Sequence, residues 1–250
     1  MRRLLPLICL VFLAACTPAG LLQALTGANP ATPVTQIILE TEASAPAVSA
    51  KALIGAAAII QHRVDLIGAD AEASASGERQ IVVRVVAYDG EISQIVRLVT
   101  RIGRVELADL RNAPPELVTN PNDALLATSA HPTLGEHIDP LTGAPYVTVI
   151  DSVQVIDAHA AVSQFTTTWD IALTFSPEHG ALLSEFTAAN IGTTLGILID
   201  GRLLSAPRIQ AQVGDEAVIA GNFSEAEARQ LAAVIGGGEL PFALTFAEIR

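Results

Sequence analysis

Hydrophobic and polar positions in the first part of the chain follow two different periods. Strand-like segments rich in β-branched residues alternate with segments whose apolar residues recur every three or four positions, as along one face of a helix. Gly68 and Gly103 stand where the two helical patterns stop, a common position for glycine. We expect strands at 34–40, 69–75, 80–86 and 104–110 and helices at 52–66 and 92–102.

These elements follow one another in the order β-α-β-β-α-β. That order is typical of the ferredoxin-like, split βαβ unit. The pattern therefore predicts an α+β protein whose first part is a ferredoxin-like base, closed by the strand at 104–110.

A second region of mixed helices and strands follows a proline-rich connection at 111–145, for which we expect at most one short helix, near 122–128. Ser176 followed by Pro177 predicts a helix start, with a buried stripe of Leu182, Leu183 and Phe186. The further expected elements are strands at 146–150, 154–162, 169–175, 195–199, 203–205, 217–220 and 241–246 and a helix ending at 235.

Two short motifs mark turns in this second region. The dipeptide Asp200-Gly201 between apolar runs predicts a type I′ hairpin, because both residues tolerate a positive φ. Ser224 and Glu227 form a capping box, which begins a helix. Three glycines at 236–238 follow that helix, whereas phosphate-binding glycines precede one, so they predict a helix end and not a nucleotide site.

The first sixteen residues have the pattern of a bacterial lipoprotein signal. Arg2 and Arg3 precede an apolar run shorter than the roughly twenty residues that span a bilayer. The run ends in Leu-Ala-Ala-Cys, which resembles the lipobox, whose cysteine, here Cys16, becomes the lipidated first residue. The other cysteine, Cys9, lies in the same segment, so cleavage would leave one thiol and no intrachain disulfide.

We therefore expect a signal peptide at 1–16 and a flexible tether at 17–33. Lipidation of Cys16 would anchor the chain in the lipid bilayer, at the outer face of the cytoplasmic membrane, without spanning it. The alternative is an ordinary signal peptide with a coincidental cysteine.

The composition of the chain argues against one class of function, nucleic-acid binding. The 250 residues are 50% hydrophobic, enough to bury a core. The chain has 14 Lys and Arg against 26 Asp and Glu, a net charge of −12, whereas nucleic-acid binding needs clustered cations. Aromatic residues make up only 4%, which is too few for a base-stacking platform. We therefore expect no nucleic-acid partner.

One cluster of potential metal ligands lies in the proline-rich connection, at His131, His137 and Asp139. A zinc site needs four ligands, or three and water, and no cysteine beyond the signal segment accompanies these residues. We predict solvated loop side chains here. The alternative is a metal-dependent enzyme that uses them. The sequence contains no Gly-x-Ser-x-Gly motif, and we predict no catalytic residues and no cofactor.

The last third of the chain resembles the first large periplasmic domain of the SecD family of protein-export membrane proteins. The resemblance lies in the motifs Asn190-Ile191-Gly192, LGILIDGRLLSAPRI at 195–209, IAGNFS at 219–224 and GELP at 238–241. Residues 62–68 and 173–178 match as well. The family-signature positions are Asp200, Gly201, Ser205, Ala206, Pro207, Gly221, Asn222 and Phe223.

This resemblance covers about 34–248, apart from the middle connection. It implies a two-part domain, in which a base at 34–111 and 236–250 carries an inserted head at 112–235.

The sequence also departs from the family. SecD has six transmembrane helices, whose proton-coupled motion drives the domain, and this sequence has no second long apolar run. The glycine-rich segment before the first strand is replaced by residues 29–33, and Ala243 replaces the second proline of Pro-x-Pro-Leu. Proton-driven pulling is therefore not carried over.

We expect a non-enzymatic, membrane-anchored lipoprotein of the cell envelope. Its SecD-like domain would bind translocating polypeptide or components of the Sec translocon, as an accessory to Sec-dependent export. The alternative is an envelope scaffold that reuses the fold for a fixed partner and has no role in export.

Overall fold

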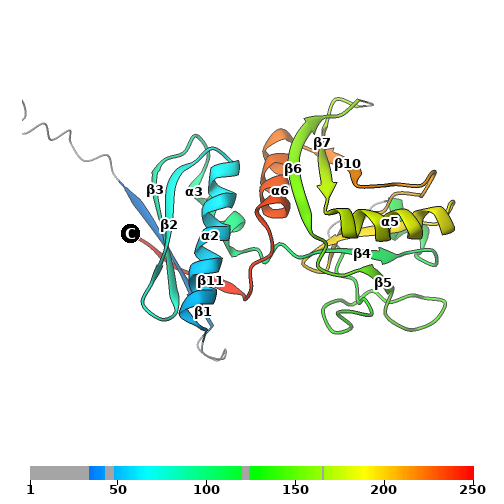
Figure 1. Ribbon diagram of the computed structural model, residues 1–250, viewed down its shortest axis with the longest axis horizontal. Coiled ribbons are helices and arrows are strands. Elements are labelled where there is room, and N and C mark those ends of the chain that lie inside the picture. Colours follow the sequence, from blue (N-terminus) through cyan, green and yellow to red (C-terminus); the bar gives the residue numbers. More distant parts are fainter. Residues whose placement is uncertain (1–33, 43–47, 120–123, 165) are drawn as a thin grey trace, which may run out of the picture. The chain divides into compact units, whose positions relative to one another are not determined.

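The computed structural model describes residues 34–42, 48–119, 124–164 and 166–250. Its strands form three antiparallel sheets (Figure 1). The N-terminal elements are β1 (Thr35–Thr41), α2 (Ala50–Leu66), β2 (Asp70–Ser76), β3 (Gln80–Ala87), α3 (Ile92–Thr100), β4 (Val105–Asp109) and α4 (Pro115–Thr119). The remaining elements are β5 (Val147–Ile150), β6 (Val155–Val162), β7 (Trp169–Phe175), α5 (Pro177–Ala189), β8 (Leu195–Ile199), β9 (Arg202–Ser205), β10 (Glu216–Phe223), α6 (Glu225–Gly237) and β11 (Leu244–Ile249).

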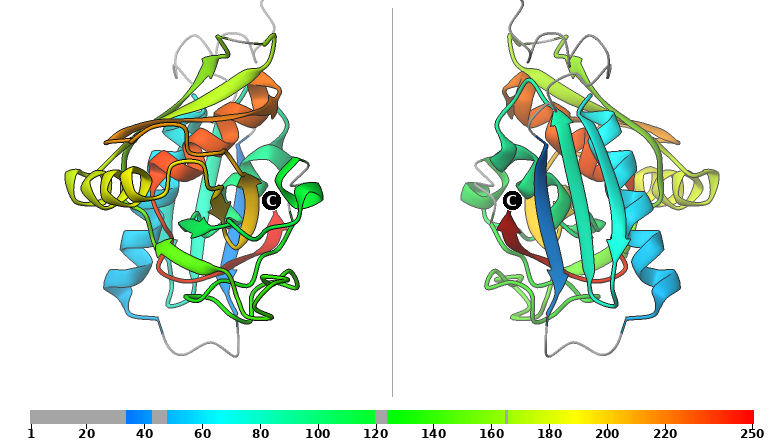
Figure 2. Two further views of the ribbon diagram at one scale, coloured as in Figure 1. Left: turned by 90° about the vertical axis from the view of Figure 1, so that its right-hand side faces the viewer. Right: turned by 90° about the vertical axis from the view of Figure 1, so that its left-hand side faces the viewer.

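The first sheet, which we call the base sheet, has the strand order β11-β1-β3-β2. Alternate residues of β1 and β3 point into the core: Ile37 and Leu39 are fully buried opposite Val83 and Ile81. The helix α2 covers this sheet with a stripe that includes Leu53 and is buried in the same core. Figure 2 shows α2 running alongside the base strands, next to β2. The α+β class predicted from the pattern is confirmed.

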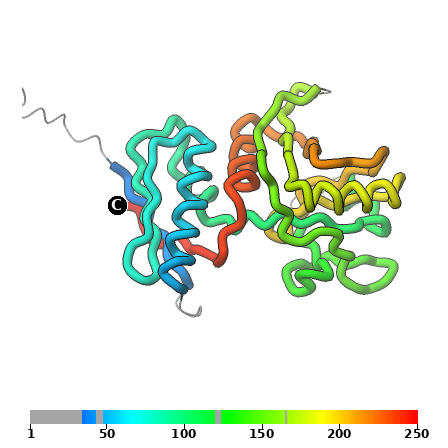
Figure 3. The backbone as a smooth tube through the Cα atoms, in the orientation of Figure 1, coloured from blue at the N-terminus to red at the C-terminus, as the bar shows by residue number. Residues whose placement is uncertain are grey.

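One strand of the base was predicted wrongly. The segment at 104–110 does form a strand, β4, but it pairs with β5 and β8 in another sheet. The strand that closes the base sheet beside β1 is β11, which comes after the whole second region. β4 buries four consecutive residues, so it lies inside a sheet covered on both faces, whereas β11 is exposed at five of six positions. Figure 3 shows the chain leaving the base after α3 and returning to it after α6.

The inserted region, which we call the head, contains two sheets with the orders β10-β7-β6 and β5-β4-β8-β9. Its helix α5 begins as predicted: Ser176 accepts a hydrogen bond from His179 N, and Pro177 is the first helical residue. Of the predicted stripe, Leu183 is buried, but Leu182 is 46% exposed. α5 therefore buries a narrower face than its sequence suggests.

The helix α6 packs against α2 and α3 of the base and against β6 and β7 of the head. Four of its six buried residues are alanine or glycine, which allows close approach of neighbouring elements. The capping box of Ser224 and Glu227 is present as predicted. The helix ends at Gly237, two residues later than expected, and is capped by Gly238, whose φ of 91° suits glycine.

The glycines within α6 serve close packing. A side chain at Gly237 would place its Cβ 2.3 Å from Cγ of Arg63, and one at Gly236 would lie 3.3 Å from Cβ of Ala158 on β6. The glycine run therefore lets one helix contact the base and the head at neighbouring positions.

The proline-rich connection differs from its prediction in one respect. Its helix is α4, at Pro115–Thr119, and not the segment near 122–128, whose described residues include Leu125, Leu126 and Thr128 in isolated β-bridges. Within the part of the chain that the structure describes, no helix is both long enough and apolar enough to cross a membrane.

Candidate functional site

Two short connectors join the base to the head, one after α3 and one after α6. They lie side by side, because Leu240 N donates a hydrogen bond to Ile102 O at 2.8 Å. Arg63, a fully buried residue of α2, holds both. Its guanidinium donates to Leu98 O (3.1 Å), Arg101 O (2.5 Å), Ile102 O (2.7 Å) and Gly238 O (2.5 Å).

Burial lowers the pKa of Arg63 to about 10, and the negative charge of Asp200 opposes this shift. The guanidinium therefore remains protonated at neutral pH. Leu98 lies in the last turn of α3, and Gly238 caps the end of α6. Carbonyl oxygens at helix C-termini carry partial negative charge, so both helix ends stabilise the buried cation.

Asp200 fixes the same connector from the head side. Its Oδ1 accepts hydrogen bonds from Gly103 N (2.8 Å) and Arg104 N (2.9 Å), and its own N–H donates to Arg104 O. The φ angles of Asp200 and Gly201 are 54° and 77°, as the predicted type I′ hairpin requires. The hairpin of β8 and β9 is therefore attached to the start of β4.

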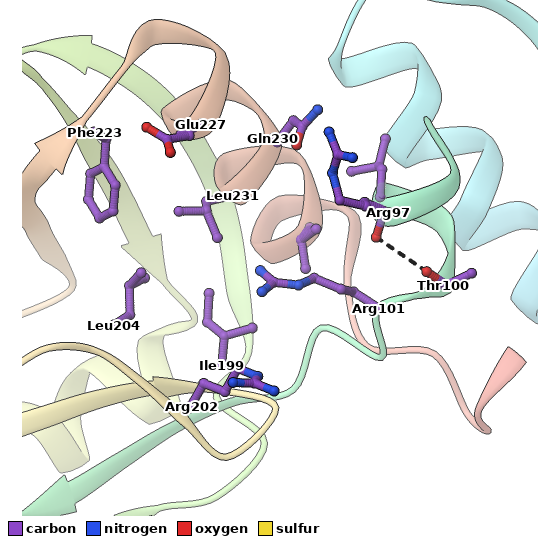
Figure 4. A pocket seen from close by; sticks show the side chains of 12 residues that line it. Arg97, Thr100, Arg101, Ile199, Arg202, Leu204, Phe223, Glu227, Gln230 and Leu231 are labelled. Carbon is purple, nitrogen blue, oxygen red and sulfur yellow. Dashed lines mark hydrogen bonds between the residues drawn. The ribbon is translucent and has the colours of Figure 1, made fainter. Parts of the chain in front are cut away.

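A cavity of about 470 Å³ lies between α3, α6 and this hairpin (Figure 4). Apolar side chains, among them Leu204, Phe223 and Leu231, line one part of it. Arg97 and Arg101 from α3 and Arg202 from the hairpin line the other part, with Glu227 of α6. Hydrogen bonds from the backbone N–H and hydroxyl of Ser224 lower the pKa of Glu227, so it is ionised at neutral pH.

A second cavity, which we call the head cavity, has a volume of about 730 Å³. Strands β7, β8 and β10, the helix α5 and the segment at 207–213 line it. Most of its lining is apolar, including Leu173, Leu195, Ile209 and Val218. Ligand-binding sites in proteins are typically concave, mostly apolar and of this size.

The head sheet that borders this cavity has two edge strands, β6 and β10, each paired only with β7 within the described residues. Both carry exposed aliphatic side chains: Ile156 and Val162 on β6 are 62% and 65% exposed, and Val218 on β10 is 58% exposed. An edge strand presents backbone N–H and C=O groups that can pair with another chain. β10 combines such an edge with the wall of the head cavity.

The family-signature residues predicted from the sequence occupy structural positions around these features. Ser205 Oγ donates to Ala220 O and links β9 to β10, and Pro207 lines the head cavity. A Cβ at Gly221 would lie 2.4 Å from the ring of Phe223, and Asn222 is exposed. Ala206 packs against the smaller core of the head. Cys16 lies outside the described residues.

The three potential metal ligands of the connection are not brought together as a group. Asp139 forms a turn, in which Asn112 and the backbone N–H groups of Leu141 and Thr142 donate to it. These hydrogen bonds lower the pKa of Asp139. His137 lies in a β-bridge with Leu126, and His131 faces Asp151 instead, at 3.0 Å.

The sequence reasoning missed Arg63 as a structural centre. Arg63 lies three residues after Ile60 and one before Val64, so it falls on the apolar stripe of its helix. A charged residue on that stripe was the available signal.

Comparison with known proteins finds similarity to SecD proteins. The family model described as "SecDF, P1 head subdomain" matches residues 142–242. The protein translocase subunit SecDF of Thermus thermophilus is 43% identical over 109 residues, which is 43% of this chain and 14% of that protein. SecD of Desulfurispirillum indicum is 26% identical over 204 residues, covering 76% of this chain and 39% of the relative.

Two solved structures of SecDF have a fold similar to that of this chain. The crystal structure of SecDF in its super-membrane-facing form has a TM-score of 0.68 at 26% identity and covers 88% of this chain and 30% of that chain. A structure of "a membrane component SecDF that enhances protein export" has a TM-score of 0.60 at 26% identity. The match covers 86% of this chain and 99% of that chain. The chain spans less than half the length of the curated relatives named above. Residues 142–242 therefore match the head subdomain of SecDF, and most of the chain is similar to the periplasmic domain of SecD proteins.

Proposed function

We propose that the head binds extended polypeptide at the β10 edge, as a non-enzymatic accessory to Sec-dependent protein export. The observation that carries this proposal is the position of Val218. It is 58% exposed, belongs to an edge strand and also lines the apolar head cavity. One peptide could therefore pair with the strand edge and place an apolar side chain in the cavity.

The chemistry of this surface suits a substrate without a fixed sequence. Backbone hydrogen bonds to an edge strand are the same for every extended peptide, and a neighbouring pocket adds affinity for apolar side chains. Unfolded chains expose both groups, whereas folded proteins bury most of them. The surface therefore favours polypeptide before folding.

The relatives support a place in export. They are named as protein translocase subunits, and one solved structure is described as a component that enhances protein export. We infer that this chain works beside the Sec translocon by passive, reversible contact, without proton-driven pulling of its own.

The binding surface is tested by a charge on the strand edge. We expect Val218→Lys to weaken binding of an unfolded, fluorescently labelled polypeptide about tenfold, because a lysine on an edge strand disfavours pairing with another strand. Fluorescence anisotropy with the purified full chain measures the affinity. The matched control is Ile54→Lys on α2, where the side chain is 63% exposed on the base.

The control should bind the polypeptide like the unchanged protein. Equal affinity for Val218→Lys and the unchanged protein would overturn the proposed surface, and equal weakening by both variants would show general charge repulsion instead.

We further propose that lipid on Cys16 anchors the chain at the outer face of the cytoplasmic membrane. Cys16→Ser should abolish incorporation of labelled palmitate, because the thiol is the acceptor of the lipid. Cys9→Ser, in the same segment, should leave the label in place. Label retained in Cys16→Ser would contradict the anchor, and the polypeptide-binding assay would still stand.

A further inference from the structure

One carboxylate of the head is buried without full hydrogen bonding. Glu106 on β4 is only 1% exposed. Its Oε1 accepts a hydrogen bond from Thr148 Oγ1 at 2.7 Å, but its Oε2 has no partner. Leaving a buried carboxylate oxygen unpaired is costly, so such a group calls for an additional interaction.

Two further donor groups lie beside this carboxylate. Glu106, His131 and Asp151 each offer one ligand atom, and these atoms all lie within 4.8 Å of one another. His131 Nε2 and Asp151 Oδ1 are 3.0 Å apart. Oxygen and nitrogen ligands at about 2.0–2.2 Å around a tetrahedral zinc ion lie about 3.3 Å from each other. The group therefore needs only small side-chain adjustments to hold one ion.

The surrounding hydrogen bonds hold the group in place. Thr148 orients Glu106, as an outer-shell donor orients a ligating carboxylate. The backbone N–H of His131 donates to the carbonyl and the hydroxyl oxygen of Thr128, a fully buried residue. Asp151 directly follows β5, the strand that pairs with β4. Each donor thus comes from a fixed part of the head.

We propose that Glu106, His131 and Asp151 bind a divalent transition metal ion, with water completing the coordination. One imidazole nitrogen and two carboxylate oxygens suit zinc, which accepts all three donor types. The ion would neutralise the buried Glu106 and tie the loop at 128–131 to both strands. We assign it a stabilising role.

A simple ion pair between His131 and Asp151 would leave Glu106 Oε2 without a partner. The same pair of residue types occurs on the surface at Asp157 and His159, 2.8 Å apart, where both side chains are about 60% exposed. That pair has no buried carboxylate beside it, and no third donor completes it among the described residues. It provides a matched control for the proposed site.

The test is calorimetric titration of zinc into the full chain, purified in detergent without a polyhistidine tag and stripped with a chelator. We expect one zinc ion per chain that is lost, or weakened at least about tenfold, in Glu106→Gln and in Asp151→Asn, while His159→Gln binds normally. Zinc at about a hundredfold over its dissociation constant should also raise the melting temperature of the unchanged protein by several degrees.

Asp151 is exposed, so its substitution tests the site even where Glu106→Gln fails to fold. Zinc retained by Asp151→Asn would overturn the proposal. Binding in the unchanged protein no stronger than in Asp151→Asn, or lost equally in His159→Gln, would also overturn it. The Cys9 and Cys16 thiols are common to all variants, so zinc bound there cancels from the comparison.

Discussion

Replacing Arg63 with Met is expected to lower the free energy of unfolding by about 3–5 kcal/mol, the largest effect of any single change considered for this protein. Met fills a similar volume but donates no hydrogen bonds, so the four carbonyl groups that Arg63 now pairs would lose their partner. These carbonyls belong to both connectors, which would loosen together. For a domain of this size, the melting temperature should fall by about 10 °C.

Thermal unfolding followed by circular dichroism measures this effect. The matched control is Arg97→Met on the exposed side of α3, which should change stability by less than about 0.5 kcal/mol. Arg63→Lys should fall between the two, because an ammonium keeps the charge but cannot reproduce the planar arrangement of donors. A melting temperature for Arg63→Met equal to that of Arg97→Met would contradict the role assigned to Arg63.

The second large effect is expected at Asp200. Asp200→Ala should cost about 2–4 kcal/mol for two reasons. The change removes the acceptor of the Gly103 and Arg104 N–H groups, and it places alanine at a φ of 54°. Two further variants separate these contributions. Asp200→Asn keeps an acceptor and tolerates the positive φ, whereas Asp200→Gly relieves the backbone but removes the acceptor.

The predicted order of stability is Asn above Gly above Ala, as measured by urea unfolding. Asp89→Ala, in the exposed Asp-Gly pair after β3, should be nearly neutral. If Asp200→Asn destabilised the protein as much as Asp200→Ala did, the hydrogen bonds to the connector would not be the source of stability. The charge facing Arg63 would then be the better explanation.

Much of the local structure could be predicted because its causes are local. The hairpin at Asp200 follows from the conformational freedom of two neighbouring residues, and the start of α6 follows from a side chain and a backbone group three residues apart. The stripe of α2 follows from the period of a helix. The sequence signal of each of these features spans only a few residues along the chain.

The partner strands of β4 and β11 could not be predicted from the same patterns. β4 is buried on both faces, so its pattern does not indicate which sheet it joins. β11 is largely exposed, so its pattern is weak, and its position was predicted a few residues too early. Sheet pairing between distant segments depends on the whole fold, and the inserted head separates β11 from the rest of the base.

The partners of the candidate site residues could not be predicted either, because they are distant in the sequence. Glu106 interrupts an otherwise apolar segment, and Arg63 falls on the apolar stripe of its helix, but neither pattern indicates a partner. Their partners come from distant positions: Gly238 for Arg63, and His131 with Asp151 for Glu106. His131 was considered as a ligand only in the alternative that grouped it with His137 and Asp139, and the structure does not bring these three together.

The central claim, that the head contacts polypeptide during export, is most directly tested by photocrosslinking in cells. A photoreactive residue would replace Val218 on the head or, as the control, Ile54 on the base, since both side chains are similarly exposed. Mass spectrometry would identify the crosslinked proteins. We expect Val218 to crosslink to many exported chains and to translocon subunits, and Ile54 to few. A single abundant envelope protein at Val218, with no exported chains, would contradict the claim and indicate a scaffold.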